Sequence, residues 1–196
     1  MKILFMGFGH LGEFFAKELS EPYELEITYR SKLNPGFSHL THYHFDSSSN
    51  EDFNFKDDYD FVIWSFTPFD EYPVLLKKAN SFFKTSTNWI YIGSTGLYGP
   101  GEVTEDSPKS HETSRSKRLA DIEQTLLEFN RNITIIRPSG LISEKRNPKT
   151  WIKRRKSITN SKNKMNLVHA QDVARFILFV IAVSYTHLTL PTILLV

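Results

Sequence analysis

Short apolar runs alternate with amphipathic segments along the whole chain. The apolar runs predict strands at residues 2–6, 24–29, 41–45, 60–64, 89–93 and 133–137. Apolar positions at helical spacing predict helices at residues 11–19, 72–81, 114–130 and 171–183. In the third helix this repeat consists of Leu119, Ile122, Leu126 and Phe129. Because alternating strands and helices form βαβ units, the pattern predicts an α/β fold, a doubly wound parallel sheet with helices on both faces.

The first strand passes without a spacer into Gly7-Phe8-Gly9-His10-Leu11-Gly12 and then into the first helix. In such a motif Gly7 allows the tight turn, Gly9 leaves room for a pyrophosphate, and Gly12 lets the helix pack closely on the strand. The N–H groups at the start of the helix then face the anion. The order of strand, glycines and helix predicts a Rossmann-type fold in which these six residues contact a dinucleotide, and a glycine-rich turn in another α/β protein is the alternative.

The second predicted strand ends in Arg30-Ser31-Lys32, without an acidic residue at its tip. An acidic residue at this point accepts hydrogen bonds from the ribose of NAD, whereas a basic residue accommodates the 2′-phosphate of NADP. A guanidinium can hold a phosphate through two hydrogen bonds, and Ser31 and Lys32 add a donor and a second positive charge. The pattern therefore favours NADP over NAD as the cofactor, with a basic surface turn as the alternative.

Composition narrows the class of protein. A chain of 196 residues with 40% hydrophobic residues can form one soluble domain with a sizeable core. The absence of cysteine excludes disulfides, zinc ribbons and cysteine nucleophiles. The net charge of +2 indicates no particular partner. Since no charged and then apolar leader precedes the first strand, we expect a cytoplasmic protein.

The C-terminal segment differs from the rest of the chain. Residues 176–196 carry no charged side chain, but Ser184, His187 and Pro191 are poorly suited to a membrane helix, so we expect no membrane contact. Residues 184–196 resemble the translation of adapter DNA. We therefore expect an NAD(P)-binding Rossmann domain at residues 1–183, incomplete at its C-terminal end, followed by a non-native tail at 184–196; a short edge strand is the alternative.

Three further segments join the glycine motif in a recognisable order: residues 89–99 (WIYIGSTGLYG), 135–142 (IIRPSGLI) and 166–174 (NLVHAQDVA). Together the four motifs resemble the extended short-chain dehydrogenase/reductase family, the NAD(P)-dependent epimerases and dehydratases that mostly act on nucleotide sugars. The resemblance covers nearly all of residues 1–183. It implies an NADP-dependent oxidoreductase, epimerase or dehydratase with a nucleotide sugar or a similar polyol as its small-molecule substrate.

The resemblance also implies roles for individual residues. Ser94 corresponds to the catalytic hydroxyl that hydrogen-bonds the reacting substrate oxygen, and Arg137 and Pro138 correspond to the Arg-Pro pair beside the nicotinamide. The family also uses a tyrosine followed four residues later by a lysine. Lys117 fits the lysine, which holds the nicotinamide ribose, but Thr113 stands at the tyrosine position.

Threonine cannot replace that tyrosine in its chemistry. A tyrosine beside an ammonium group exchanges a proton with the substrate hydroxyl as hydride moves, whereas a threonine hydroxyl is too weak an acid. The departure resembles the atypical branch of the family, which lacks the usual pair. Tyr98, His111 and His169 are candidate replacements, although a packed turn aromatic, a loop residue and a helix-orienting histidine are their structural interpretations. The alternative function is a non-catalytic protein that senses NADP(H) and relays redox state to a partner.

Other residues allow weaker inferences. Asp46 matches the position where the family contacts the adenine amino group, and a solvated loop aspartate is the alternative. The histidines at 39, 42 and 44 lack a carboxylate at ligand spacing, so we predict no metal site. Residues 145–164 are strongly basic, which suits a phosphate-bearing ligand or a solvated loop. Because Trp151 is the one aromatic residue interleaved with these charges, we expect no nucleic-acid partner. The basic residues of the segment are Lys145, Arg146, Lys149, Lys153, Arg154, Arg155, Lys156, Lys162 and Lys164.

Overall fold

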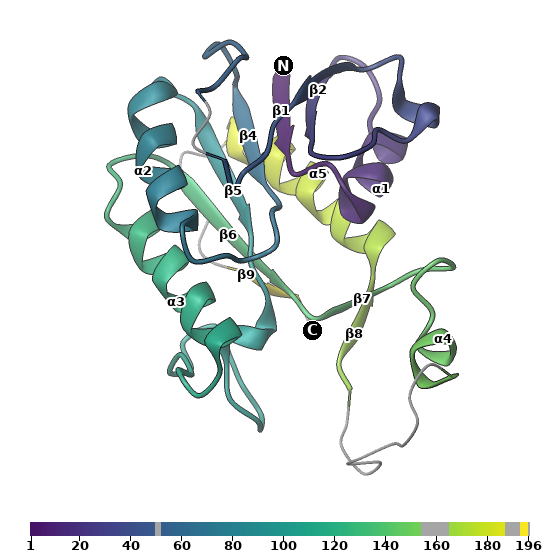
Figure 1. Ribbon diagram of the computed structural model, residues 1–196, viewed down its shortest axis with the longest axis vertical. Helices are drawn as coiled ribbons and strands as arrows, with labels where there is room; N and C mark the ends of the chain where they lie inside the picture. The colour runs from purple at the N-terminus through teal and green to yellow at the C-terminus, as the bar shows by residue number, and fades with distance from the viewer. Residues whose placement is uncertain (50–51, 154–164, 187–192, 196) are drawn as a thin grey trace.

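One parallel sheet organises the protein. The computed structural model describes residues 1–49, 52–153, 165–186 and 193–195. Its main sheet has seven strands in the order β3-β2-β1-β4-β5-β6-β9, all paired in parallel (Figure 1). The strands are β1 (Lys2–Met6), β2 (Glu24–Tyr29), β3 (Thr41–His44), β4 (Phe61–Trp64), β5 (Asn88–Ile92), β6 (Ile133–Pro138) and β9 (Ile193–Leu195). Because the chain runs outward from β1 in both directions, the order reverses between β1 and β4, which creates a topological switch point.

Helices cover both faces of this sheet, so the prediction of a doubly wound α/β fold is confirmed. Two of them, α2 and α3, pack on one face, and α1 and α5 pack on the other (Figure 1). The helices are α1 (His10–Glu18), α2 (Tyr72–Phe82), α3 (Ser114–Leu127), α4 (Pro148–Lys153) and α5 (Ala170–Thr186), with short 3₁₀ turns η1 (Pro35–Phe37) and η2 (Thr95–Leu97). A small second sheet pairs β7 (Gly140–Ile142) with β8 (Leu167–His169), and lies with α4 at one end of the molecule (Figure 1).

Each face of the sheet has its own core. The core under α2 and α3 is aromatic and includes the fully enclosed side chains of Trp64, Tyr72 and Trp89. The core under α1 and α5 is mainly aliphatic, with Ile27 and Ile177 at full burial. A side chain of this size stabilises the fold by about 1.5–3 kcal/mol when it is removed from water. Strands that are buried on both faces appear in the sequence as unbroken apolar runs.

Arg131 binds the carbonyl groups at the C-terminal end of α2. The guanidinium of Arg131 lies 4.3 Å from the ring centre of Trp89 and donates hydrogen bonds to the carbonyl oxygens of Asn80 (2.9 Å) and Phe83 (3.1 Å). These carbonyls belong to the last turn of the helix, whose partial negative charge attracts a cation. The loop before β6 is thereby tied to the end of α2.

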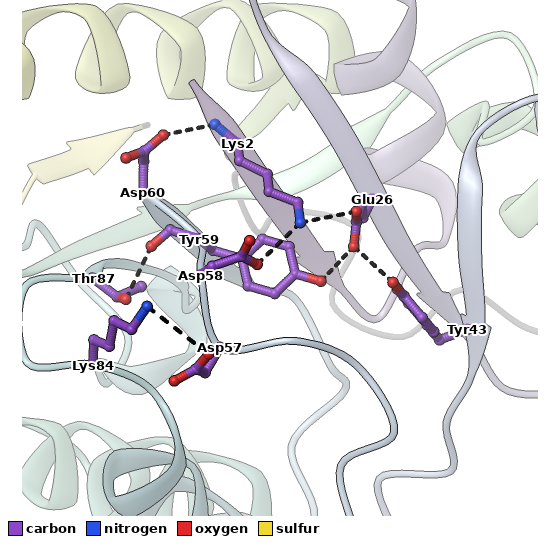
Figure 2. A network of polar contacts seen from close by, with 9 residues as sticks. All are labelled: Lys2, Glu26, Tyr43, Asp57, Asp58, Tyr59, Asp60, Lys84 and Thr87. Carbon is purple, nitrogen blue, oxygen red and sulfur yellow. Dashed lines mark hydrogen bonds and ion pairs between the residues drawn. The ribbon is translucent and has the colours of Figure 1, made fainter.

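A buried carboxylate joins the first two strands to the segment before β4. Glu26 of β2 is 5% exposed, accepts hydrogen bonds from Tyr59 and Tyr43, and lies 3.2 Å from the ammonium of Lys2 in β1 (Figure 2). Lys2 in turn lies 3.0 Å from Asp58. Because every oxygen of the buried carboxylate has a partner, the network holds β1 and β2 in a fixed position below the glycine turn.

The C-terminal segment takes part in the fold. Residues 184–186 continue α5, and β9 pairs in parallel with β6. Residues 187–192 and 196 lie outside the described part of the chain, and the assignment of 184–196 as a non-native tail stays a prediction. No helix within the described residues is long and apolar enough to cross a membrane.

Candidate functional site

A cleft of about 670 Å³ opens at the carboxyl ends of the central strands. Segments that follow five strands form its wall, and α3 adds two side chains. The wall consists of residues 7–11 after β1, 28–30 at the end of β2, 45 and 47–48 after β3, 65–69 after β4, 92–94 after β5, 115 and 119 of α3, and 141 and 146. Ligands of open α/β sheets bind at this edge, beside the switch point, so the cleft is the candidate site.

The first two glycines shape one end of the cleft. Gly7 has φ +78°, and a Cβ there would lie 2.7 Å from the ring of Phe66 and 3.0 Å from the backbone of Ser65. Glycine alone tolerates this turn, as the sequence predicted. A Cβ on Gly9 would meet no atom nearer than 3.9 Å, so open space lies above that residue. Gly9 also begins α1, and no side chain caps the helix there, which leaves its first N–H groups directed at the cleft.

The third glycine of the motif, Gly12, is required for a different reason from the one we expected. A Cβ on Gly12 would lie 2.6 Å from the ring of Phe8, so Gly12 makes room for this ring rather than for close contact between helix and strand. Phe8 packs edge-on against Phe5 and Phe37. Phe8 and the buried Leu11 both line the cleft, and their packing fixes the turn on the core.

Arg30 lies at the opposite end of the cleft wall from Ser94, at the tip of β2. Its predicted companions Ser31 and Lys32 are exposed and do not line the cleft. Ser47 lines the cleft instead, from the loop after β3. Ser47 could not be predicted from the sequence, because it lies in a serine-rich run that contains no motif.

Asp46 holds the neighbouring turn rather than lining the cleft. Its carboxylate accepts hydrogen bonds from the backbone N–H of Ser48 (3.0 Å) and from the Ser48 hydroxyl (2.7 Å). These hydrogen bonds hold the pKa of the Asp46 carboxyl below its usual range. Asp46 therefore positions Ser48, which does lie on the wall.

Ser94 lies on the wall where β5 ends, as predicted. Its Oγ accepts a hydrogen bond from the backbone N–H of Gly96 (3.1 Å), which fixes the oxygen and leaves the hydroxyl proton available to a ligand. Arg115 reaches the same place, since its Nε lies 3.6 Å from the point that a Cβ on Gly96 would occupy. Sequence analysis missed Arg115.

The rotation of α3 separates the predicted pair of residues from the cleft. Thr113 is the N-cap of the helix, where its hydroxyl accepts from the N–H of Ser116 (3.0 Å). The residues of α3 on the cleft wall are Arg115 and Leu119, one turn apart. Since a helix turns about 100° per residue, Lys117 lies roughly 200° around the axis from Arg115. The structure thus brings Ser94 to the cleft and leaves Thr113 and Lys117 off its wall.

Arg137 faces α3 instead of the cleft. Its Nε and Nη2 each lie 2.8 Å from a carboxylate oxygen of Glu123, which is fully buried, and its Nη1 donates to the hydroxyl of Tyr98 (2.7 Å). Lys109 lies 3.1 Å from the same carboxylate. Burial alone would lower the pKa of Arg137, but Glu123 raises it, so the guanidinium stays charged. Arg137 and the buried Pro138 do not line the cleft, and this ion cluster fastens the loop after β5 to α3.

The candidate replacement acids occupy structural positions. The hydroxyl of Tyr98 accepts from Arg137 and donates to a backbone carbonyl, and burial raises its pKa. His111 is exposed and lies off the cleft wall. The Nδ1 of His169 accepts from the N–H of Gln171 (3.2 Å) at the start of α5. Each position matches the structural interpretation of that residue.

The two remaining clusters from the sequence are the histidines of β3 and the basic segment at residues 145–164. His42 and His44 both pack edge-on against the ring of Tyr29, and no three His, Asp or Glu side chains among the described residues gather as a metal site requires. In the basic segment, Arg146 lines the cleft. Lys145, Lys149 and Lys153 are exposed. Residues 154–156, 162 and 164 lie outside the described part of the chain.

Comparison with solved structures finds the same fold in other proteins. No family model and no curated protein matches the sequence. A Methylobacillus flagellatus structure assigned as an NAD-dependent epimerase/dehydratase matches 99% of this chain and 74% of its own, with TM-score 0.75 and 21% identity. UDP-glucuronic acid 4-epimerase from Bacillus cereus, in complex with a fluorinated UDP-glucuronic acid and NAD, matches 93% and 73%, with TM-score 0.73 and 15% identity.

A third solved structure is assigned a different activity. A Streptococcus pneumoniae TIGR4 chain assigned as an NADH-flavin reductase matches 95% of this chain and 94% of its own, with TM-score 0.60 and 20% identity. At these identities the three likenesses establish the Rossmann-type fold, and the chemistry must be argued from this chain's own cleft.

Proposed function

We propose that the protein is an NADP-dependent oxidoreductase of the epimerase/dehydratase type, with a nucleotide sugar or similar polyol as substrate. The observation that carries the proposal is the cleft itself, which extends from Arg30 past the open space above Gly9 to Ser94. These are the groups that a dinucleotide and a substrate hydroxyl need, in the order in which they need them. Two structural neighbours support the same class: one is assigned as an NAD-dependent epimerase/dehydratase, and the other is an epimerase in complex with NAD and a fluorinated UDP-sugar.

The pyrophosphate and the 2′-phosphate of the cofactor each have a matching group on the wall. The N–H groups at the start of α1 would bind the pyrophosphate, and Arg30 would bind a 2′-phosphate through a charge-assisted hydrogen bond. When bound, the nicotinamide supplies hydride transfer. Ser94 would donate a hydrogen bond to the reacting substrate oxygen, because the N–H of Gly96 already fixes the serine oxygen as an acceptor.

A second candidate function follows from the absence of a proton donor near Ser94 on the described part of the cleft wall. The ionisable side chains on the described wall are His10, Tyr29, Arg30, Arg115 and Arg146. His10 lies at the glycine turn after β1, and Tyr29 lies at the end of β2. Neither residue belongs to the segment after β5 that carries Ser94. The lack of an acid beside Ser94 favours a non-catalytic sensor of NADP(H) as the alternative.

One titration separates these functions. NADPH and NADH are added to the protein while nicotinamide fluorescence is followed, and a panel of nucleotide sugars is then added. Binding followed by sugar-dependent oxidation or a product shift supports the enzyme. Binding without turnover supports the sensor, and a protein that binds neither nucleotide contradicts both functions.

Replacing Arg30 by glutamine is expected to weaken NADPH binding by about tenfold to a hundredfold, because one charge-assisted contact to the 2′-phosphate is lost. NADH lacks this phosphate and is expected to bind equally well to both proteins. The measurement is the Kd for each nucleotide by fluorescence titration. Lys32→Gln is the matched control, since it removes an exposed charge two residues away that does not line the cleft. Equal weakening of both nucleotides by Arg30→Gln would refute the assignment.

Replacing Ser94 by alanine is expected to lower kcat about a hundredfold, as the loss of a preorganised donor does in other active sites. The Kd for NADPH should change by less than about twofold, because a serine that donates to substrate adds little to cofactor binding. Ser94→Thr keeps the hydroxyl and should retain most of the activity. Full turnover by the alanine variant would show that Ser94 takes no part in the chemistry.

A further inference from the structure

The turn that follows β7 is docked on the first residue of α1. The Oγ of Ser143 lies 3.0 Å from Nε2 of His10, although 133 positions separate the two residues in the chain. Beside it, Nζ of Lys145 lies 3.6 Å from a carboxylate oxygen of Glu13. Two contacts therefore hold the turn at residues 143–146 against the start of the helix, next to the glycine turn.

This docking fixes the backbone of Arg146. Within the turn, the N–H of Arg146 donates to the carbonyl oxygen and to the Oγ of Ser143, both at 3.1 Å, and the N–H of Ser143 donates to the carbonyl of Arg146 at 3.3 Å. Ser143 is itself buried, so it anchors Arg146 to His10. Burial, followed by the charge of Arg146, lowers the pKa of His10.

The guanidinium of Arg146 lacks a protein partner within the described chain. It lines the cleft, and none of the described hydrogen bonds or ion pairs involves its side chain. Its neighbour Lys145 has a carboxylate partner, and none of the described residues on the cleft wall is acidic. An arginine that is fixed at its backbone, directed to a cleft and left without a counter-charge is suited to bind an anion.

Position decides which anion this is. Arg30 and Arg115 lie at the tip of β2 and at Ser94, whereas Arg146 is held through Ser143 at His10, the first residue of α1. The open space above Gly9 lies at the same helix start. We propose that Arg146 binds the diphosphate of the dinucleotide, as a second donor beside the N–H groups of α1. This inference rests on the proposed dinucleotide site and assigns Arg146 of the basic segment to the cofactor rather than to the substrate.

The test compares Arg146→Gln with Lys149→Gln in the full chain. The probes are NADPH, NADH and ADP-ribose, which contain a diphosphate, and 2′-AMP, which does not; 2′-AMP is measured by displacement of NADPH. Arg146→Gln is expected to raise the Kd of the three diphosphate compounds by a similar factor, about tenfold to a hundredfold, and to leave 2′-AMP unchanged. Lys149→Gln removes an exposed charge three residues away that does not line the cleft, and it should change none of them.

Other outcomes overturn the inference and remain distinct from a failure of the proposed function. Unchanged binding of all four probes to Arg146→Gln would refute the contact. Equal weakening of 2′-AMP would indicate a general effect of charge, and an increase confined to the KM of a nucleotide sugar would assign the guanidinium to the substrate. A wild-type protein that binds none of the probes would instead refute the dinucleotide site. Because Arg146 is exposed, both variants should melt with the wild type, and this is checked first.

Discussion

Replacing Arg137 by methionine is expected to lower the free energy of unfolding by about 3–5 kcal/mol, because it strands a charge in the protein interior. The carboxylate of Glu123 is fully buried and has two hydrogen bonds of 2.8 Å from Arg137. Methionine fills a similar volume but leaves this carboxylate with Lys109, at 3.1 Å, as its remaining charged partner. Urea denaturation of the variant and the wild type at neutral pH measures the difference.

A double variant separates lost charge pairing from lost packing. When Glu123→Leu is combined with Arg137→Met, both buried charges are absent and we expect most of the lost stability to return. The Arg137→Met protein should bind NADPH like the wild type under conditions where it is folded, because Arg137 is not on the cleft wall. A variant that melts normally but no longer binds NADPH would contradict this account and would support the nicotinamide-side role implied by the family resemblance.

The fold was predictable because its signals are local. The runs that became β1 and β4 are apolar without interruption, since parallel strands in this sheet are buried on both faces. The N-terminal end of α3 was also visible in the sequence, where Thr113 and Ser116 form a capping box. Its other end was predicted at residue 130 but lies at Leu127, because the following N–H groups bond in a tighter pattern that no side chain announces.

The site was predictable only in part, because long-range packing decides which side chains face the cleft. The glycine turn depends on consecutive residues, and it forms as predicted. The face of α3 that turns to the cleft depends instead on Leu119 and Ile122, which pack into different parts of the core. A motif spacing carried over by resemblance contains no such information. One available signal was that Arg115 precedes the apolar Leu119 by one helical turn, so both share a face.

Residues that approach from distant segments could not be predicted at all. Arg146 reaches the glycine turn because Ser143 docks on His10, a contact between opposite ends of the domain. Arg137 illustrates the reverse case, since its buried partner Glu123 lies in a helical pattern that suggests an exposed position. In both cases the cationic residue is plain in the sequence, but tertiary packing decides whether it meets a carboxylate, as Arg137 does, or is left without one, as Arg146 is.

Replacing Glu26 by leucine is the second change expected to cost about 3–5 kcal/mol of unfolding free energy, since it leaves the buried phenol of Tyr59 and the half-buried phenol of Tyr43 without their acceptor. The ammonium of Lys2 then keeps Asp58 as its partner. Tyr59 and Tyr43 both donate to this carboxylate, and Lys2 lies 3.2 Å from it (Figure 2). Burial and Glu26 together raise the pKa of Tyr59, so its hydroxyl stays a donor across the accessible pH range. Glu26→Gln keeps one acceptor oxygen and should lie between the wild type and the leucine variant.

The pH dependence tests whether the charge of Glu26 produces this stability. Burial alone raises the pKa of Glu26, but the hydrogen bonds from Tyr59, Tyr43 and Lys2 outweigh burial and lower it in the folded protein. Stability from such a group is present above its ordinary pKa, about 4.3, and is lost as pH falls through the lower folded value. The difference in unfolding free energy between wild type and Glu26→Leu should therefore be largest near neutral pH and should narrow in acid. A difference that stays constant with pH would assign the loss to packing, because other carboxylates titrate alike in both proteins.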